Sequence, residues 1–362
     1  MTKQRTPSKQ LSIDGRQISK SSPVYFIAEI GSNFDQDLSR AKDLIYMAKE
    51  AGADAAKFQH YTAQSLVSDV GFKGLAANNS HQSSWKKSVY DTYDDASLNQ
   101  DWTEILRDTC ADAGLAFFTS PYSFDLVDLV DDFVPAHKIG SGDITWTGII
   151  EHIARKDKPV LLATGASNMA DVQRAMNTIL DFNSDVILMQ CNTNYTASRD
   201  NFNYLHLNVL RKFQEIYPGI ITGLSDHTQG DVSVLGAVTL GARVIEKHFT
   251  DSIERDGPDH AFSMTPTTMR DMIERTRDLQ AALGISEKEV EPNEKETIVL
   301  QRRSICAAKN LSKGTIISED HLNMLRPCPD GSIQPFEVDQ LVGRVLLTDI
   351  KNGDHLKWED VN

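Results

Sequence analysis

Two histidines follow two successive strand-like runs of the chain and offer a ligand type that divalent metals favour. His227 lies in Gly223-Leu-Ser-Asp-His-Thr and His248 in Val244-Ile-Glu-Lys-His-Phe-Thr, with a helix-like segment between them. In a barrel of parallel strands, adjacent strand ends meet at one rim. Two imidazoles there would supply half of a metal site, ringed by Ser225, Asp226, Glu246 and Lys247. The alternative is a pair of ordinary histidines whose ring nitrogens are satisfied by hydrogen bonds.

Two lysines stand at or near other strand ends, where a buried ammonium group needs a partner. Lys57 lies within Ala55-Ala-Lys-Phe-Gln, and Lys138 precedes the glycine-rich turn Ile139-Gly-Ser-Gly. An unpaired charge in a buried strand is costly, so Lys57 favours a functional interpretation. The N–H groups of the turn and the Ser141 hydroxyl can hold an oxyanion. Phosphate binding beside a Lewis acid and a carbonyl suggests phosphoenolpyruvate chemistry with an aldehyde acceptor.

The remaining strand ends carry carboxylates, hydroxyls and amides that would share the same rim. Glu29 directly follows Phe26-Ile-Ala, which predicts a semi-buried acid, base or hydrogen-bond acceptor. A helix cap or a salt bridge at the barrel mouth is the alternative. The other polar residues at these strand ends and in the last loop are Gln59, Thr119, Ser120, Asp143, Thr164, Asn192, Thr193, Asn194, Tyr195, Ser225 and Asp259.

Short apolar runs alternate with amphipathic, helix-like segments through most of the chain. The expected strands are Tyr25–Glu29, Ala55–Phe58, Leu115–Thr119, Ala136–Ile139, Pro159–Ala163, Val186–Gln190, Ile220–Ser225 and Val244–Phe249. The expected helices between and after them are Leu38–Ala51, Leu126–Val130, Ile149–Ile153, Val172–Leu180, Val232–Leu240 and Met272–Leu283. Together these elements predict an α/β fold, a (β/α)₈ TIM-type barrel; a doubly wound open sheet is the alternative. The connection from Tyr61 to Gln100 is unusually long. It predicts a functional lid or interface element, or else a partly disordered insertion.

Beyond the barrel the sequence changes character. The charged stretch Ser286–Thr297 indicates a linker, and short strand-like runs separated by turns follow it. We therefore expect a barrel domain over residues 1–285, a linker over 286–298 and a small β-rich domain over 299–362. Such a small domain has barely enough residues for its own core, so it would gain stability by packing on a partner.

The bulk composition narrows the classes of partner. The chain has 362 residues and a formal net charge of -14, which argues against nucleic acid and against anionic membranes. The net charge does not exclude an anionic small-molecule ligand, because a local cationic pocket can bind an anion within a negatively charged protein. No apolar run approaches the ~20 residues that a membrane span needs, and no secretory signal is visible. Four scattered cysteines without a CxxC pair indicate free thiols in a reducing cytoplasm.

Several strings of the chain, in order, resemble the sialic acid synthase (N-acetylneuraminate synthase) family. They are Phe26-Ile-Ala-Glu-Ile-Gly-Ser-Asn, Ala51-Gly-Ala-Asp-Ala-Ala-Lys-Phe-Gln, Phe118-Thr-Ser-Pro-Tyr, Lys138-Ile-Gly-Ser-Gly-Asp, Gly223-Leu-Ser-Asp-His-Thr, Glu246-Lys-His-Phe-Thr and Gly257-Pro-Asp. The last domain resembles the family's antifreeze-like (SAF) domain through Ala308-Lys-Asn-Leu-Ser-Lys-Gly and Leu325-Arg-Pro. The resemblance implies a (β/α)₈ barrel and a domain-swapped homodimer, in which the small domain of one chain covers the barrel mouth of the other.

The resemblance also implies a reaction and a set of roles. Phosphoenolpyruvate would condense with an open-chain N-acylated amino hexose, here N-acetylmannosamine, while water is consumed and phosphate released. His227 and His248 would bind Mn²⁺ or Mg²⁺. The phosphoenolpyruvate cradle would comprise Lys57, Lys138, Ser120, Ser141 and Ser225. The acceptor contacts would comprise Gln59, Asp143, Thr193, Tyr195, Asp259 and Arg326 of the partner subunit, with Glu29 near the reacting carbon.

Three departures from the family pattern put the exact sugar in question. Asp143 stands where some members have Glu, and Ala163 stands where some have a phosphate-contacting Ser. In Cys191-Asn-Thr-Asn-Tyr, the roles of Asn192 and Thr193 are hard to assign. The acceptor could instead be a di-acetamido deoxyhexose, as in legionaminic or pseudaminic acid synthases. A non-catalytic sugar-binding protein and a Schiff-base lysine aldolase are the remaining alternatives.

Overall fold

Eight parallel strands form the central sheet of this computed structural model, which describes residues 4–74 and 87–362. They are β3 (Tyr25–Gly31), β4 (Ala55–His60), β5 (Ala116–Pro121), β6 (His137–Ile139), β7 (Val160–Ala163), β8 (Val186–Cys191), β9 (Ile221–Asp226) and β10 (Val244–His248). Hydrogen bonding orders them β5-β4-β3-β10-β9-β8-β7-β6, and β5 and β6 lie beside each other at the seam. The sheet is a nearly closed barrel, which confirms the predicted (β/α)₈ fold.

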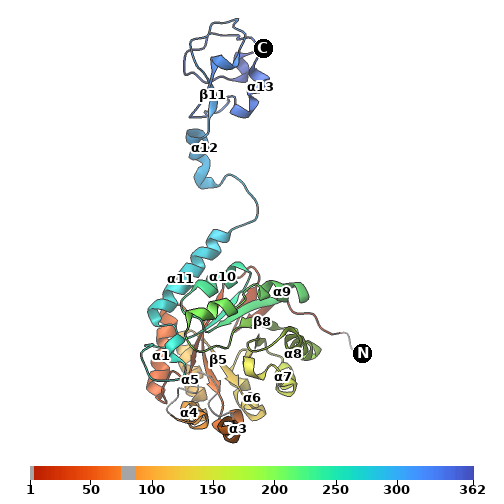
Figure 1. Ribbon diagram of the computed structural model, residues 1–362, viewed down its shortest axis with the longest axis vertical. Helices are drawn as coiled ribbons and strands as arrows, with labels where there is room; N and C mark the ends of the chain where they lie inside the picture. Colours follow the sequence, from red (N-terminus) through yellow and green to blue (C-terminus); the bar gives the residue numbers. More distant parts are fainter. Residues whose placement is uncertain (1–3, 75–86) are drawn as a thin grey trace. The chain divides into compact units, whose positions relative to one another are not determined.

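Helices follow these strands and cover the outside of the barrel (Figure 1). They are α1 (Leu38–Glu50), α5 (Thr103–Ala113), α6 (Phe124–Val130), α7 (Thr147–Ala154), α8 (Met169–Phe182), α9 (Val209–Ile216), α10 (Val232–Thr239) and α11 (Pro266–Leu283). Asp37 caps α1 by accepting hydrogen bonds from the N–H groups of Ser39 and Arg40. The apolar patterns predict all of these helices except α5 and α9. The buried face of α5 includes two threonines and a cysteine, which weakens its apolar period.

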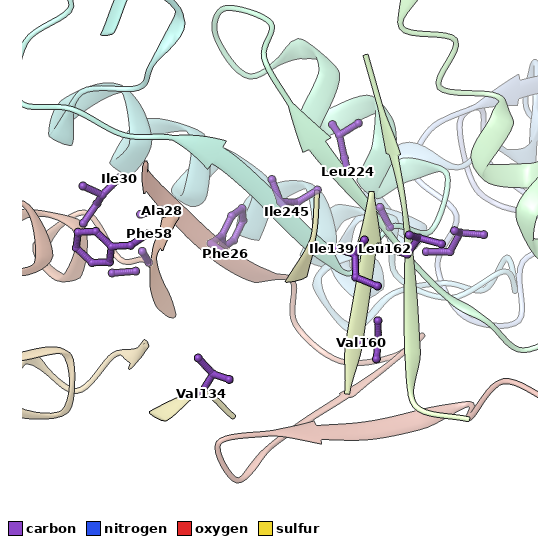
Figure 2. Packing of buried hydrophobic residues seen from close by; sticks show 14 of the residues in the cluster. Phe26, Ala28, Ile30, Phe58, Val134, Ile139, Val160, Leu162, Leu224 and Ile245 are labelled. Atoms are coloured by element: carbon purple, nitrogen blue, oxygen red, sulfur yellow. The ribbon is translucent and has the colours of Figure 1, made fainter. Parts of the chain in front are cut away.

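Side chains alternate between the two faces of each strand. On β3, Phe26, Ala28 and Ile30 belong to the hydrophobic layer outside the barrel, shown with Ile245 of β10 in Figure 2. Tyr25 and Ile27 belong to the layer inside the barrel. Because side chains repeat every two residues, Glu29 also lies on the inner face, where it is fully buried. The register of each strand therefore decides which polar groups reach the barrel interior.

A hairpin that the sequence analysis does not predict precedes the barrel. Its strands β1 (Gln10–Ile13) and β2 (Arg16–Ser19) pair in antiparallel fashion. Asp14 and Gly15 connect them with positive φ angles of 49° and 74°, as a type I′ turn requires. The hairpin buries Leu11, Ile13 and Ile18 against the inner layer of the barrel. The Asp-Gly pair between short alternating runs was the usable signal.

The long connection between β4 and α5 contains helices in its described parts. These are α2 (Ala63–Leu66), α3 (Asp69–Gly74) and α4 (Val89–Ala96). Thr62 caps α2 through a reciprocal bond pair with Ser65, and the Ser88 hydroxyl accepts the N–H of Asp91 at the start of α4. Residues 75–86 of the same connection lie outside the described residues. The described parts are therefore structured elements rather than an open loop.

The second unit of the chain covers Ile285–Asn362, and the first covers Met1–Gly284. The second unit contains α12 (Lys295–Gln301), α13 (Val338–Leu341) and the antiparallel strands β11 (Ser304–Ala307) and β12 (Leu322–Leu325). It has a hydrophobic core of its own, which includes Ile305, Ile333 and Leu356. In the described residues, no helix combines the length and apolar character needed to cross a membrane.

Candidate active site

A cavity of about 350 Å³ opens at the carboxyl ends of the barrel strands. Every strand contributes to its lining, either directly or through the loop that follows it. The strand-end residues that line it are Glu29, Lys57, Gln59, Ser120, Lys138, Ser141, Ala163, Tyr195, Ser225, His227, Glu246 and His248, and Asp259 joins them from the loop after β10. Chemistry in barrel enzymes gathers at this end of the sheet, because loops from all strands converge there.

Glu246 binds the cationic groups of the cavity floor together. Its Oε1 atom accepts hydrogen bonds from Lys138 Nζ at 3.0 Å and from the Ser225 hydroxyl at 3.2 Å, and it lies 3.8 Å from Lys57 Nζ. Lys57 Nζ also lies 2.5 Å from Glu29 Oε2 and donates to the Ser120 hydroxyl at 3.3 Å. Both predicted phosphate-binding lysines thus sit in one buried network of ion pairs.

The two carboxyl groups of this network differ in their pKa values. Burial raises the pKa of Glu29 to about 7, even though Lys57 opposes the shift. Burial acts the same way on Glu246, but the ammonium groups of Lys138 and Lys57 outweigh it and hold the pKa of Glu246 below its usual value. Glu246 is therefore an anion at neutral pH, while Glu29 can gain or lose a proton there.

The Asp259 carboxylate also approaches Glu29, because the residue that separates them, Gly31, has no side chain. Gly31 has φ +54°, and a Cβ atom there would lie 3.1 Å from Asp259 Oδ2 and 3.2 Å from Glu29 Oε1. Burial raises the pKa of Asp259 to about 6. Gln59 Nε2 donates to Glu29 Oε1 at 2.7 Å and fixes its orientation. Three predicted site residues, Glu29, Gln59 and Asp259, therefore meet on one side of the cavity.

The two histidine rings lie next to each other in the same cavity, with their planes tilted by 45°. Their ring centroids are 5.2 Å apart, and Phe262 packs edge-on against both rings. His227 Nδ1 lies 2.9 Å from the backbone carbonyl of Asn192, which can only accept, so this nitrogen carries the proton. Burial lowers the pKa of His227 to about 4 and, with the neighbouring His227, puts the pKa of His248 well below its usual value. Both rings are neutral at pH 7, as metal ligands must be.

The donor set fits a divalent metal that is held by few protein ligands. His248 Nδ1 is buried without a hydrogen-bond partner, 3.6 Å from Asp259 Oδ2. With Nδ1 of His227 occupied by a carbonyl, its Nε2 is left with a lone pair, the arrangement that second-shell contacts impose on metal-binding histidines. Among the described residues, no group of three His, Cys, Asp or Glu side chains could hold an ion. An ion here would therefore keep positions open for water or substrate oxygen.

Other predicted contacts surround these groups. The Tyr195 ring lies 4.4 Å from that of His227, centroid to centroid. The Ser141 hydroxyl accepts the N–H of Gly165 at 2.9 Å at the edge of the cavity. Ala163 lines the cavity as well, at the position where the resemblance expects a serine in some members. One hydroxyl of the expected phosphate set is thus absent from this chain.

Three of the residues to which the resemblance gives a role lie outside the cavity lining. Asp143 ends the short 3₁₀ turn that begins at Ser141, and burial raises the pKa of its carboxyl to about 6. The Thr193 methyl group packs against Gly165, at which a Cβ atom would collide with it. Arg326 is exposed in the second unit, directly after β12. The roles of these three residues remain predictions.

Two residues expected around the histidines belong to a different place in the fold. Lys247 and Asp226 form a buried ion pair at 2.9 Å, and Lys247 also donates to the carbonyls of Thr228 and Gly230. Neither side chain lines the cavity. The period of two on β10 explains this, because Glu246 and His248 face inward and Lys247 faces outward. The expectation that Asp226 and Lys247 ring the metal site is wrong.

Glu246 is the main site residue whose role the sequence analysis missed. Its position two residues before His248 already predicts that both side chains share one face of the strand. Its partners Lys57 and Lys138 are distant in sequence, so pairing could not be read from local spacing. Tyr61, Tyr122 and Ser32, which also line the cavity, gave no signal beyond their places near strand ends.

Comparisons with known proteins agree with this architecture. The model of the NeuB family matches residues 44–288, and that of the SAF domain matches residues 302–362. The N,N'-diacetyllegionaminic acid synthase of Legionella pneumophila is 34% identical, over 93% of this chain and 94% of its own. The pseudaminic acid synthase of Helicobacter pylori is 30% identical, over 94% and 98%. The crystal structure of N-acetylneuraminic acid (sialic acid) synthetase from Leptospira borgpetersenii is similar with a TM-score of 0.70 at 25% identity, over 81% and 96%.

Proposed function

The chain belongs to the NeuB family, and we propose that it is a nonulosonic acid synthase. It would join phosphoenolpyruvate to the open-chain aldehyde of an N-acylated amino hexose and release phosphate. The observation that carries the proposal is the network on Glu246 Oε1, which gathers two lysines and a serine beside two neutral imidazoles. Such a site offers cations for a phosphate and lone pairs for a metal within one cavity.

The phosphate group would bind beside Glu246 and share its two lysines. Lys57 and Lys138 would compensate its charge, and the hydroxyls of Ser120, Ser141 and Ser225 would donate hydrogen bonds to its oxygens. Because all five groups are fixed by a buried framework, they need little reorganisation when phosphate leaves. The Ala163 position lacks a hydroxyl, so five donors rather than six would hold the group.

The reaction moves one proton in each direction, and Glu29 is suited to exchange it. A carbon–carbon bond forms between the alkene carbon of phosphoenolpyruvate and the aldehyde carbon, and the aldehyde oxygen gains a proton. Water adds to the adjacent carbon and gives up one proton. The bond from that carbon to the phosphate oxygen then breaks, the added hydroxyl becomes the ketone oxygen, and its remaining proton leaves with the phosphate. A carboxyl group whose pKa is about 7 can supply and remove these protons.

A divalent ion such as Mn²⁺ or Mg²⁺, held by His227 and His248, would supply Lewis-acid polarisation of the aldehyde oxygen. Asp259 lies beside His248 and would orient the acceptor or the water that adds in the reaction. Tyr195 packs edge-on against His227 and lines this side of the cavity. Gln59 and Tyr195 would contact the sugar, with Asp143 and Thr193 behind them.

N-acetylmannosamine is the first candidate acceptor, which would make the product N-acetylneuraminate. A di-acetamido deoxyhexose is the second candidate, and the names of the Legionella and Helicobacter relatives favour it. Phosphate release from phosphoenolpyruvate, measured with a panel of N-acylated amino hexoses, tests the proposal. We expect release only with an acceptor, and loss of release with a chelator. Sugar binding without phosphate release would favour a non-catalytic binder; chelator-resistant activity with borohydride trapping would favour a Schiff-base aldolase.

We also propose a domain-swapped homodimer in which Arg326 of the partner subunit reaches the N-acyl group. Arg326 is exposed, as such a role requires. Arg326→Ala should raise the KM for the sugar at least about tenfold and leave the KM for phosphoenolpyruvate unchanged, because one charged hydrogen bond is lost. Arg302→Ala, also exposed, is the control. Equal effects on both substrates, or a monomer by sedimentation, would count against this assignment.

A further inference from the structure

Asn33 is a buried polar residue that has no part in the proposed reaction as described so far. It lies in the turn between β3 and α1, its side chain is fully buried, and it does not line the cavity. Its backbone is held at both groups, because its N–H donates to the carbonyl of Ile30 at 2.8 Å and its carbonyl accepts from Arg40 Nε at 2.9 Å. The backbone of Asn33 is therefore a fixed point from which its side chain can orient other groups.

The side-chain amide of Asn33 links two segments that carry residues of the site. Its Nδ2 donates to the carbonyl of Phe249, the residue directly after His248, and to the Ser263 hydroxyl, both at 3.0 Å. That hydroxyl in turn donates to the backbone carbonyl of Asp259 at 2.6 Å. The carbonyl of Phe249 can only accept, so the NH₂ group of the amide must face it. One amide group thus connects the strand end that carries His248 with the loop that carries Asp259.

The two connected residues meet in the cavity, where His248 Nδ1 lies 3.6 Å from Asp259 Oδ2. His248 is fixed by the hydrogen-bonded ladder between β10 and β3, whereas Asp259 lies in the loop beyond that ladder. The position of Asp259 therefore depends on contacts such as the one through Ser263. Groups that act together in catalysis need fixed positions, because a displacement of about 1 Å can slow a reaction about 100-fold.

The amide of Asn33 is only half satisfied, which distinguishes it from a purely structural amide. Its Oδ1 atom is buried and has no hydrogen-bond partner among the described residues, a state that costs about 1–3 kcal/mol. Asn183, which is also buried, lies near the amino end of β8 and uses both sides of its amide. Its Nδ2 donates to the carbonyl of Lys158 at 2.7 Å, and its Oδ1 accepts the N–H of Asp185 at 2.8 Å. The unpaired oxygen of Asn33 indicates that its two donor contacts serve a purpose other than stability.

We propose that Asn33 is a positioning residue, which fixes the spacing between His248 and Asp259 through the two hydrogen bonds that its amide donates. This inference rests on the proposed function, because the spacing matters to the reaction only if Asp259 acts beside His248. The amide makes no contact with the lysines that would hold the phosphate group. Loss of the amide should therefore slow turnover and leave the binding of phosphoenolpyruvate intact.

The test compares Asn33→Leu with Asn183→Leu, since both replace a buried amide by an apolar side chain of similar size. Asn33→Leu should lower kcat about 10- to 100-fold, because Asp259 loses its fixed position. Its KM for phosphoenolpyruvate should stay within about twofold of the wild-type value. Asn183→Leu should lose stability and keep its kcat. Steady-state phosphate release with the acceptor that the wild type uses, normalised to folded protein, measures both. An unchanged kcat in Asn33→Leu, or equal losses of kcat in the two variants, would overturn the inference.

A second variant keeps the test independent of how Asn33→Leu folds. Ser263→Ala removes one oxygen atom, the middle link between Asn33 and Asp259, and should also lower kcat, by up to about 10-fold. The double variant should lose no more than Asn33→Leu alone, because both changes break the same link. Losses that multiply, or a normal kcat in Ser263→Ala, would overturn the inference and leave the proposed function in place. Absence of phosphate release by the wild type with every acceptor would overturn the proposed function and the inference together.

Discussion

Two buried lysine–carboxylate clusters lie on opposite faces of β10, and they differ in how completely their polar atoms are satisfied. In the outer cluster, Lys247 donates to Asp226 and to two backbone carbonyls, and Asp226 also accepts from Thr228 and Ser233. In the inner cluster, Lys138 and Lys57 both turn to one oxygen of Glu246, and the other oxygen is buried without a hydrogen-bond partner.

This difference separates a structural cluster from a functional one. Buried polar groups in proteins are nearly always paired, so the outer cluster is complete as it stands. The inner cluster has unpaired buried atoms next to an open cavity, which is the state expected of a site that a ligand completes. We therefore propose a structural role for the outer pair and a ligand-binding role for the inner one, although both rest on buried lysines.

The largest expected effect is on activity, from Lys138→Met. Without this ammonium group the transferred phosphate loses a charged partner, so kcat/KM for phosphoenolpyruvate should fall by about 10³-fold or more. Lys247→Met should keep nearly full activity per folded molecule. Steady-state phosphate release, normalised to folded protein, measures both. Equal losses in the two variants would remove the distinction between the clusters.

Stability should respond in the opposite order. Lys247→Met leaves the Asp226 carboxylate buried and uncompensated, which we expect to cost about 3–5 kcal/mol. Lys138→Met should cost less, because Lys57 stays beside Glu246 and the cavity admits water. Urea unfolding of the two variants and the wild type gives these free energies. A greater loss of stability in Lys138→Met would contradict the comparison.

Metal binding should stabilise the protein only through the histidines of the cavity. At 100 times its Kd, Mn²⁺ should raise the free energy of unfolding by about 2.7 kcal/mol in the wild type. His248→Ala should abolish this gain, and turnover with it, while His152→Ala on the protein surface should retain both. Thermal unfolding with Mn²⁺ and with a chelator provides the measurement. Full metal-independent activity in His248→Ala would refute the metal role.

The last expected effect concerns pH, and it is spread over several pH units. Burial raises the pKa of Glu29 to about 7 in the folded protein, against roughly 4.3 in an unfolded chain. Between these values the folded state holds a proton that the unfolded state has released. The stabilisation is therefore present at low pH and lost as the pH rises to 7, by at most about 1.4 kcal/mol per pH unit. Glu29→Gln should lack this slope in urea unfolding; parallel profiles would contradict the assignment.

Sequence patterns predicted the barrel well because its strands are buried on both faces and bounded by turns. All eight observed strands begin within one residue of their expected starts. Local sequence also predicted that one rim of the barrel carries Lys57, Lys138, His227 and His248, since the carboxyl ends of parallel strands lie together. The hairpin β1–β2 was missed because only Leu11, Ile13 and Ile18 mark it.

The errors arose where the face of a strand or a distant partner mattered. Lys247 and Asp226 were assigned to the rim by closeness in sequence, but strand alternation turns them outward. Glu246 received no role, because its partners come from β4 and β6 and only the closed sheet brings them together. The helices of the long connection could not be foreseen because they are short: α2 has 4 residues and α4 has 8.

Direct binding of phosphoenolpyruvate tests the central claim, that the inner cluster is a ligand site and the outer cluster is structural. Calorimetric titration of the wild type, Lys138→Met and Lys247→Met, each at a temperature where it is folded, measures it. We predict the same Kd for the wild type and Lys247→Met, and binding at least about 100-fold weaker for Lys138→Met. Wild-type affinity in Lys138→Met, or equal weakening in both variants, would contradict the account.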